Sequence, residues 1–293
     1  MKNLEEQNQQ CRMEAVVCDK MENEFNNNSY TTKGEGILMG NLKENGYEKY
    51  DMMHSLHYDG IEEDYKEILD YFENLPEDDY APGLNRYRRY SRALVLPTSG
   101  GIEWLPTVKR DSAEYAAYFQ GKFNPEHSGS YREFHSIDES IRNNKLLREI
   151  IMADYHETFW KEEEKIMPIH VGVHFVKLLV TQDGEKAVSS PDCLHQDGEP
   201  FTFAHLIKRE NVKGGTNAIG IPAVRGSRPE EVSEKDIHEI FELENPLESY
   251  GVYDSKVSHY VSPVEKGNGP EETGVRSIIL IDYQQTVVAD VDE

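Results

Sequence analysis

Apolar residues recur at helical spacing in two early segments of the chain. Between Gly60 and Leu75 they lie three or four residues apart, and Pro76 follows the last of them, which is typical of an amphipathic helix. The same spacing from Ile141 to Phe159 predicts a second helix. Each predicted helix has one apolar face, so we expect both to pack against the core.

The second half of the chain is dominated by β-rich runs that are separated by turn residues. The predicted strands span residues 86–96, 131–137, 169–180, 201–207, 218–224, 251–261 and 275–289. Between two of them, residues 228–241 open with Arg-Pro-Glu-Glu and predict a further helix. Early helices followed by many short strands fit an α+β fold. We expect a double-stranded β-helix, a jelly-roll or cupin-like core, flanked by helices on one face.

The first residues differ in composition from the rest of the chain. Residues 1–35 are rich in Glu, Gln, Asn and Lys without sustained periodicity, which predicts a disordered leader with one weak helix at Arg12–Phe25. Residues 36–293 are predicted to form a single domain. No run of residues is apolar enough for a membrane span or a signal peptide. The odd count of 3 cysteines argues against a disulfide framework, so we expect a cytoplasmic protein.

The charge balance limits the partners. Formal net charge is -24, from 55 acidic and 31 basic residues, which would repel a phosphate backbone, so no nucleic acid is expected to bind. The one basic cluster lies in the predicted strand at residues 86–96, where alternation turns only part of it to one face. A small anionic substrate suits that cluster better than DNA. No feature of the sequence indicates an oligomeric state.

A His-x-Asp motif carries the candidate chemistry. Alternate residues of a strand share a face, so His195 and Asp197 can hold one ion between them while Gln196 points away. The distant His259 completes a set of two imidazoles and one carboxylate, which leaves positions open on an iron ion. The same donors could bind zinc, and a pair of surface histidines without a metal is the structural alternative.

One arginine stands out because it begins an apolar strand. Arg276 is followed by the run Ile-Ile-Leu-Ile at residues 278–281. A buried guanidinium is costly unless it is paired, and its planar fork binds a carboxylate with two parallel hydrogen bonds. The partner of Arg276 is therefore either an internal Asp or Glu or the carboxylate of a small molecule.

Further motifs follow one another in order along about residues 80–285. They are Arg-x-Arg-x-Tyr-Ser-Arg at 86–92, Arg-x-Phe-x-Ser-Ile at 132–137, His-x-Asp-x-Glu-Pro-x-x-Phe-x-His at 195–205, Gly-Gly-x-Asn at 214–217, and a distal-histidine strand at 256–263. In this combination the chain resembles the iron(II)/2-oxoglutarate-dependent dioxygenases. Within them it is most similar to the amino-acid hydroxylase group that includes L-isoleucine 4-hydroxylase.

The resemblance implies a mechanism and a set of cofactors. Catalytic iron(II) would be held by His195, Asp197 and His259, and Arg276 would bind the distal carboxylate of 2-oxoglutarate. O2 would be the second co-substrate, ascorbate an activator, and succinate and CO2 the products. One departure is that Ile278 stands where many relatives have the Ser of Arg-x-Ser, so a Tyr or Thr elsewhere must supply the second contact to that carboxylate.

The implied reaction is hydroxylation of an unactivated C–H bond of a free L-amino acid. Aliphatic substrates such as isoleucine, leucine or valine are favoured, with lysine-like ones next. Desaturation or ring closure of an amino acid by the same oxidant is the enzymatic alternative. A non-catalytic, metal-stabilised cupin-like binding protein is the alternative of another class, although structural metal sites usually have four protein ligands.

A free amino acid needs a cation for its carboxylate and an acid or carbonyl for its ammonium. The candidate substrate-binding residues are Arg86, Arg88, Arg92, Arg132 and His174. Ordinary scaffold arginines and a core histidine are the structural alternatives for these positions. His205 is predicted to be structural or to support the ligands, and Glu199-Pro200 to turn the strand beyond them without acting as a catalytic acid.

Overall fold

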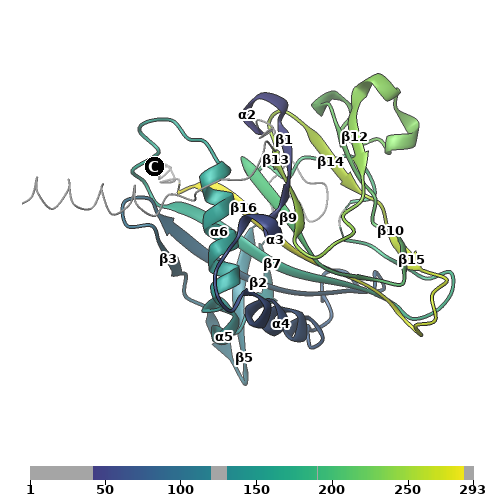
Figure 1. Cartoon of the computed structure of the whole chain (residues 1–293), viewed down its shortest axis with the longest axis horizontal. Coiled ribbons are helices and arrows are strands. Elements are labelled where there is room, and N and C mark those ends of the chain that lie inside the picture. Colours follow the sequence, from purple (N-terminus) through teal and green to yellow (C-terminus); the bar gives the residue numbers. More distant parts are fainter. Residues whose placement is uncertain (1–41, 120–130, 190, 287–293) are drawn as a thin grey trace, which may run out of the picture. The chain divides into compact units, whose positions relative to one another are not determined.

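The computed structural model describes residues 42–119, 131–189 and 191–286 (Figure 1). All of these residues lie in one compact unit, 40–293. The predicted leader at residues 1–35, with its weak helix at Arg12–Phe25, lies outside the described residues. Within the described ranges, no helix is both long and apolar enough to cross a membrane.

A seven-stranded antiparallel sheet forms the larger wall of the fold (Figure 1). In order across the sheet its strands are β1 (Tyr47–Asp51), β13 (Glu248–Tyr253), β9 (Phe201–Glu210), β16 (Gly274–Gln285), β7 (Ile169–Val180), β2 (Arg86–Leu96) and β3 (Gly101–Trp104). The strands predicted at 86–96 and 169–180 are therefore confirmed to the residue. The mostly antiparallel arrangement with few helices confirms the expected jelly-roll core.

Three small antiparallel sheets complete the described strands. One contains β10 (Val212–Gly214), β15 (Val264–Lys266) and β8 (Lys186–Ala187); the second contains β12 (Ile237–Phe241), β11 (Asn217–Gly220) and β14 (Ser258–Val261); the third contains β4 (Val108–Arg110), β5 (Ala113–Phe119) and β6 (Tyr131–His135). The second and third sheets bring residues that are distant in sequence to one cavity, as described below.

Helices lie mainly before the second half of the chain, as expected. They are α2 (Leu42–Asn45), α3 (Met52–Ser55), α4 (Ile61–Phe72), α5 (Glu139–Arg142) and α6 (Lys145–Glu157). The helix predicted from Ile141 to Phe159 is interrupted near Asn144. The side chain of Asn144 accepts the backbone N–H of Leu147 at 3.1 Å and so caps the start of α6.

The helix predicted at residues 228–241 is wrong. Two short 3-10 helices, η2 (Pro229–Glu231) and η3 (Glu234–Asp236), are followed by strand β12, and a third, η1 (Pro222–Val224), precedes them. The physical reason lies in pairing. Residues 237–241 alternate between half-buried and exposed side chains, and they pair with β11, so a period of two and a partner strand override the helical spacing.

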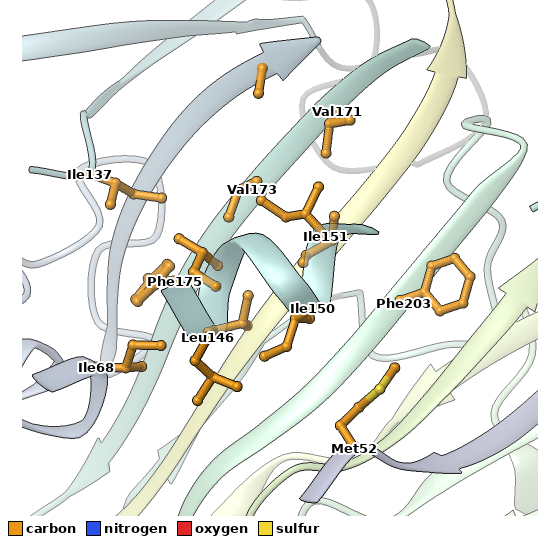
Figure 2. Close-up of a cluster of buried hydrophobic side chains, with 14 of the residues drawn as sticks. Met52, Ile68, Ile137, Leu146, Ile150, Ile151, Val171, Val173, Phe175 and Phe203 are labelled. Atoms are coloured by element: carbon orange, nitrogen blue, oxygen red, sulfur yellow. The ribbon is translucent and has the colours of Figure 1, made fainter. Parts of the chain in front are cut away.

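Strand β7 is buried on both faces, which places it at the centre of the fold. Its odd-numbered side chains Val171, Val173 and Phe175 pack with residues of α6, among them Leu146, Ile150 and Ile151 (Figure 2). Its even-numbered side chains from Val176 onward join a second apolar cluster with β9, β11, β13 and β16. The helices therefore cover one face of the large sheet, and the other face lines the interior of the jelly roll.

Candidate active site

The three predicted ligands meet in the structure. His195 and His259 form an isolated antiparallel bridge, each donating its backbone N–H to the other's carbonyl at 2.9 Å. Their rings lie 4.3 Å apart between centroids. Nε2 of His195 is 3.6 Å and Nε2 of His259 is 3.3 Å from carboxylate oxygens of Asp197. One ligand atom from each of the three residues lies within 4.8 Å of the others, so the cluster can hold a metal ion.

The nitrogen atoms of this cluster fit a metal. Nδ1 of His195 donates to the carbonyl of Cys193 at 3.0 Å, so Nε2 carries the lone pair that faces the cluster. Burial, with repulsion from His259, lowers the pKa of His195 to about 4, which keeps its imidazole neutral. Nε2 of His259 is buried without a hydrogen-bond partner among the described residues, and a metal ion would satisfy it.

A fourth residue, Asp254, holds the backbone next to Asp197. Its carboxylate accepts the backbone N–H of Asp197 at 2.9 Å and that of Gly198 at 3.0 Å. Asp254 lies in the connection from β13 to β14, so it ties the Asp197 loop to the strand that carries His259. Nothing in the local sequence signals this role, because it arises only when the two segments meet.

A buried cavity of about 110 Å³ opens beside the triad. Even-numbered residues of β16 line it in sequence: Arg276, Ile278, Leu280 and Asp282. Six residues of strand span roughly 20 Å, so Arg276 and Asp282 mark two ends of the cavity with apolar side chains between them. At the Asp282 end, its pairing partner Thr202 donates to Asp197 at 3.4 Å, which places the triad near that end.

Arg276 is a buried cation that lacks a carboxylate partner among the described residues. Its side chain is only 2% exposed, and its Nε and Nη2 atoms make no hydrogen bond. Burial lowers the pKa of Arg276 to about 10, and the nearby Tyr250 opposes that shift. The internal Asp or Glu partner considered from the sequence is therefore not present in the described part of the chain.

Arg86 and Arg88 reach the cavity from β2, but Arg86 is already paired. Its Nε donates to Asp78 at 2.8 Å and its Nη1 to the carbonyl of Ser189 at 2.9 Å. Arg88 lies 4.0 Å from Asp78 and donates to Nδ1 of His174 at 2.5 Å. Burial, followed by repulsion from Arg86, lowers the pKa of Arg88 to about 10. Asp78 therefore pairs closely with Arg86. The positive charge of Arg88, which also lines the cavity, is only partly balanced, because Asp78 is 4.0 Å away.

Arg132 comes from β6 and stacks with aromatic rings that it shares with Arg88. Its guanidinium lies 5.1 Å from the ring of Tyr118 and 5.3 Å from that of Phe134, and Arg88 lies 4.3 Å from Phe134. Cation–π contacts of this kind hold guanidinium groups away from water. Arg88, Arg132 and Tyr118 all line the cavity, but Arg92 is not among the lining residues.

His174 bridges the basic and acidic parts of the cavity. Because Nδ1 accepts from Arg88, Nε2 carries the proton and donates to Asp282 at 3.1 Å. Burial, reinforced by Arg88 and Arg132, lowers the pKa of His174 well below its ordinary value. His174 is thus a neutral residue of the cavity wall.

Two acidic residues of the cavity were not assigned to substrate from the sequence. Burial, with Asp282 and Asp197 nearby, raises the pKa of Glu199 to about 9. Burial likewise raises the pKa of Asp282 to about 6. The sequence could have indicated a role for Asp282, because an acidic residue interrupts an apolar strand there. No feature of the sequence marks Tyr118 or Tyr250 as cavity residues. His205 points away from the cavity and binds Asp154 at 2.9 Å, as a structural histidine does.

The comparisons with known proteins agree with this fold and this cluster. The family profile described as 2OG-Fe dioxygenase matches residues 69–282. The chain belongs to the 2OG-Fe dioxygenase family and is an enzyme of that class. Iron(II), 2-oxoglutarate and O2 are the cofactor and co-substrates that this family implies. Family membership also sets aside the non-catalytic cupin-like alternative.

Two characterised relatives match most of the chain. It is 32% identical over 218 residues to L-isoleucine-4-hydroxylase of Bacillus thuringiensis, covering 73% of this chain and 80% of the relative. It is 30% identical over 227 residues to 3(1)-hydroxy-L-isoleucine 4-dioxygenase of Pantoea ananatis, covering 75% of this chain and 81% of the relative. The resemblance to the amino-acid hydroxylase group is therefore confirmed.

Solved structures support the fold. The crystal structure of IDO from Bacillus thuringiensis superposes with a TM-score of 0.66 at 22% identity, covering 87% of this chain and 99% of that one. A bsmA homologue from Methylobium petroleophilum gives a TM-score of 0.67 at 18% identity, covering 84% and 90%. These likenesses confirm the predicted jelly-roll architecture.

Proposed function

We propose that this enzyme hydroxylates an unactivated C–H bond of a free L-amino acid, with conversion of 2-oxoglutarate to succinate and CO2. The observation that carries the proposal is one cavity lined both by the His195–Asp197–His259 cluster and by the buried Arg276, whose Nε and Nη2 atoms have no hydrogen-bond partner among the described residues. The two relatives named above act on isoleucine and hydroxyisoleucine. We therefore propose an aliphatic amino acid such as isoleucine, leucine or valine, with lysine-like substrates next.

His195, Asp197 and His259 would hold iron(II), which leaves open positions for substrates. When bound, the iron centre supplies oxidation of an unactivated C–H bond coupled to oxidative decarboxylation of 2-oxoglutarate. The protein contributes position and charge. The hydrogen bond from His195 to Cys193 fixes its tautomer, and Asp254 fixes the backbone that carries Asp197.

The Arg276 end of the cavity suits the co-substrate. The guanidinium of Arg276 would bind the distal carboxylate of 2-oxoglutarate with two parallel hydrogen bonds. The apolar side chains of Ile278 and Leu280 line the cavity between Arg276 and the triad. Tyr250 is buried, lines the same cavity and lies in electrostatic contact with Arg276. It is our candidate for the hydroxyl that the missing Arg-x-Ser serine would supply.

The part of the cavity wall formed by β2, β5 and β6 suits the substrate. Arg88 and Arg132 lie together over the rings of Tyr118 and Phe134, and a carboxylate placed between them would meet two guanidinium groups. Arg86 is a weaker candidate because Asp78 already neutralises it. Arg92 has no contact with the cavity to support a role in binding, and His174 would orient Arg88.

The test is release of succinate from 2-oxoglutarate with iron(II), ascorbate and air, across the protein amino acids. We expect strong stimulation by one aliphatic amino acid and a product heavier by one oxygen atom. A product lighter by two hydrogen atoms would instead establish desaturation or ring closure. Ascorbate is expected to activate by keeping the iron reduced.

Asp197→Ala is the matched control for this assay. It removes the only carboxylate of the three-residue cluster, so we expect loss of iron binding in equilibrium dialysis as well as loss of succinate release. Retention of both properties by Asp197→Ala would contradict the assignment of the cluster. Absence of any stimulating amino acid would contradict the proposed substrate class.

A further inference from the structure

Glu199 and Asp282 are two buried carboxyl groups that face the cavity without a cationic protein partner. Their exposed fractions are 6% and 7%, and among the described residues the one ion-pair contact of these two groups is that of Asp282 with His174. Asp282 accepts a hydrogen bond from His174, which is a neutral donor. A buried carboxyl group is costly unless it is paired. The wall at this end of the cavity therefore presents two buried acid groups that no described Lys or Arg side chain pairs with.

Space for one of these carboxyl groups is built into the neighbouring strand. A Cβ atom at Gly172 would lie 2.2 Å from a carboxylate oxygen of Asp282. Any larger residue on β7 would displace the carboxyl group, so the glycine lets Asp282 sit against the backbone while still lining the cavity. This accommodation indicates that the position of Asp282 is specified by the surrounding fold.

The acidic residues and the arginines are close to a common neighbour. Tyr118 lies 5.1 Å from the guanidinium of Arg132 and 5.7 Å from that of Arg88. Burial, followed by the nearby Glu199 and Asp282, raises the pKa of the Tyr118 phenol well above its ordinary value. The cavity thus places two guanidinium groups and two acid groups near one aromatic ring, which are the two kinds of group that a zwitterion needs.

We propose that Glu199 and Asp282 bind the ammonium group of the substrate, while arginines of the same cavity receive its carboxylate. The proposal rests on the amino-acid hydroxylase function proposed above and assigns its specificity. An ammonium has three donors and a positive charge, so it would satisfy both carboxyl groups. The substrate class is then a free amino acid with an unblocked α-ammonium group, and not a 2-hydroxy acid, an N-acyl amino acid or a peptide-bound residue.

The variants Glu199→Gln and Asp282→Asn test this assignment, because each keeps the size of the side chain and replaces an acid group, which can become an anion beside a bound ammonium, with a neutral amide. The probes are L-isoleucine and its 2-hydroxy analogue, 2-hydroxy-3-methylpentanoic acid. Binding is measured by calorimetry on the full chain loaded with zinc(II) and 2-oxoglutarate, a combination that does not turn over. We expect each variant to bind L-isoleucine at least tenfold more weakly, with unchanged affinity for the hydroxy acid.

A matched control is Glu210→Gln, which removes an exposed acid that pairs with Lys208 at the far end of β9. It is expected to bind both probes as the unchanged protein does. If Glu199→Gln and Asp282→Asn bind L-isoleucine normally, or lose both probes equally, the ammonium assignment is overturned. It is also overturned if the unchanged protein binds the hydroxy acid as tightly as L-isoleucine.

Failure of the underlying function gives a different result. In that case no protein amino acid stimulates succinate release in the unchanged protein, whatever the variants do. If another amino acid stimulates it most strongly, that amino acid and its 2-hydroxy analogue replace the isoleucine pair, with the same expected contrast. Zinc binding and 2-oxoglutarate binding in each variant report whether the substitution has damaged the neighbouring triad.

Discussion

The carboxylate of Asp254 accepts the backbone N–H of Asp197 at 2.9 Å, and the same carboxylate accepts the N–H of Gly198 at 3.0 Å. One buried side chain thereby fixes two consecutive peptide groups beside the only carboxylate of the metal cluster. Groups that orient metal ligands contribute to affinity without touching the metal.

Asp254→Asn is therefore expected to weaken metal binding about 10- to 100-fold. An amide has one acceptor oxygen for two N–H groups, so the Asp197 loop loses one anchor. The measurement is competition with a chelator for zinc(II) or iron(II). Asp183→Asn is the control, since the side chain of Asp183 is 92% exposed on a remote turn. Equal metal affinity of both variants would show that Asp254 does not position the ligand.

Gly215→Ala is expected to disturb Arg276, which lines one end of the cavity. A Cβ atom at Gly215 would lie 2.9 Å from both Cδ and Nε of Arg276, at a backbone φ of +69. We expect affinity for 2-oxoglutarate to fall about tenfold, because the guanidinium must move, while metal affinity stays the same. Calorimetric titration of the zinc-loaded protein with 2-oxoglutarate measures this.

The control for that substitution is Gly184→Ala. Gly184 has a φ of +84 with no atom within 4 Å of a built Cβ, so it reproduces the backbone strain without the contact. A loss of 2-oxoglutarate affinity in both variants would mean that strain alone is responsible, and that Gly215 has no particular relation to Arg276.

Asp154→Ala is expected to destabilise the fold by about 2–4 kcal/mol. Asp154 on α6 accepts from Nε2 of His205 on β9 at 2.9 Å, and Nδ1 of His205 lies 2.8 Å from Ser249 on β13. All three side chains are buried, so removing the carboxylate leaves a buried donor without a partner. Urea unfolding measures the change, with Asp183→Ala as the exposed control. A change below about 0.5 kcal/mol would mean that water replaces the carboxylate.

His174 predicts a pH dependence of stability. Its folded pKa is well below the ordinary 6.5, mainly through burial, so the unfolded chain takes up a proton below pH 6.5 that the folded chain does not. Stability should therefore fall as the pH drops below 6.5, by at most about 1.4 kcal/mol per pH unit from this group. His174→Gln keeps an acceptor and a donor for Arg88 and Asp282 but does not titrate.

The measurement is the free energy of unfolding of the unchanged protein and of His174→Gln between about pH 8 and about pH 5. The difference between them is expected to be constant above pH 6.5 and to shift in favour of the variant at lower pH. Parallel curves over the whole range would show that His174 titrates normally in the folded state.

The sequence by itself determined the architecture and pointed to the candidate metal-binding residues, because strands, helices and the His-x-Asp pair depend on local pattern. Strand β7 follows from its apolar run, α4 from its helical spacing, and the His195–Asp197 pair from alternate positions of one short segment. The same local reasoning failed at residues 228–241, where helical spacing and strand alternation are hard to separate over a short segment and a partner strand decided the outcome.

Only the tertiary structure decided which charged side chains share the cavity. Arg86 and Arg88 lie on the same face of β2, and both line the cavity. Asp78 pairs closely with Arg86, so Arg88 is the better candidate to bind a substrate. Glu199 reads locally as part of a turn, and its proximity to Asp282 depends on how two distant segments approach. Parity fixes the face of a strand that a residue occupies, but the partner across a cavity is set by strand order and register, which no local pattern contains.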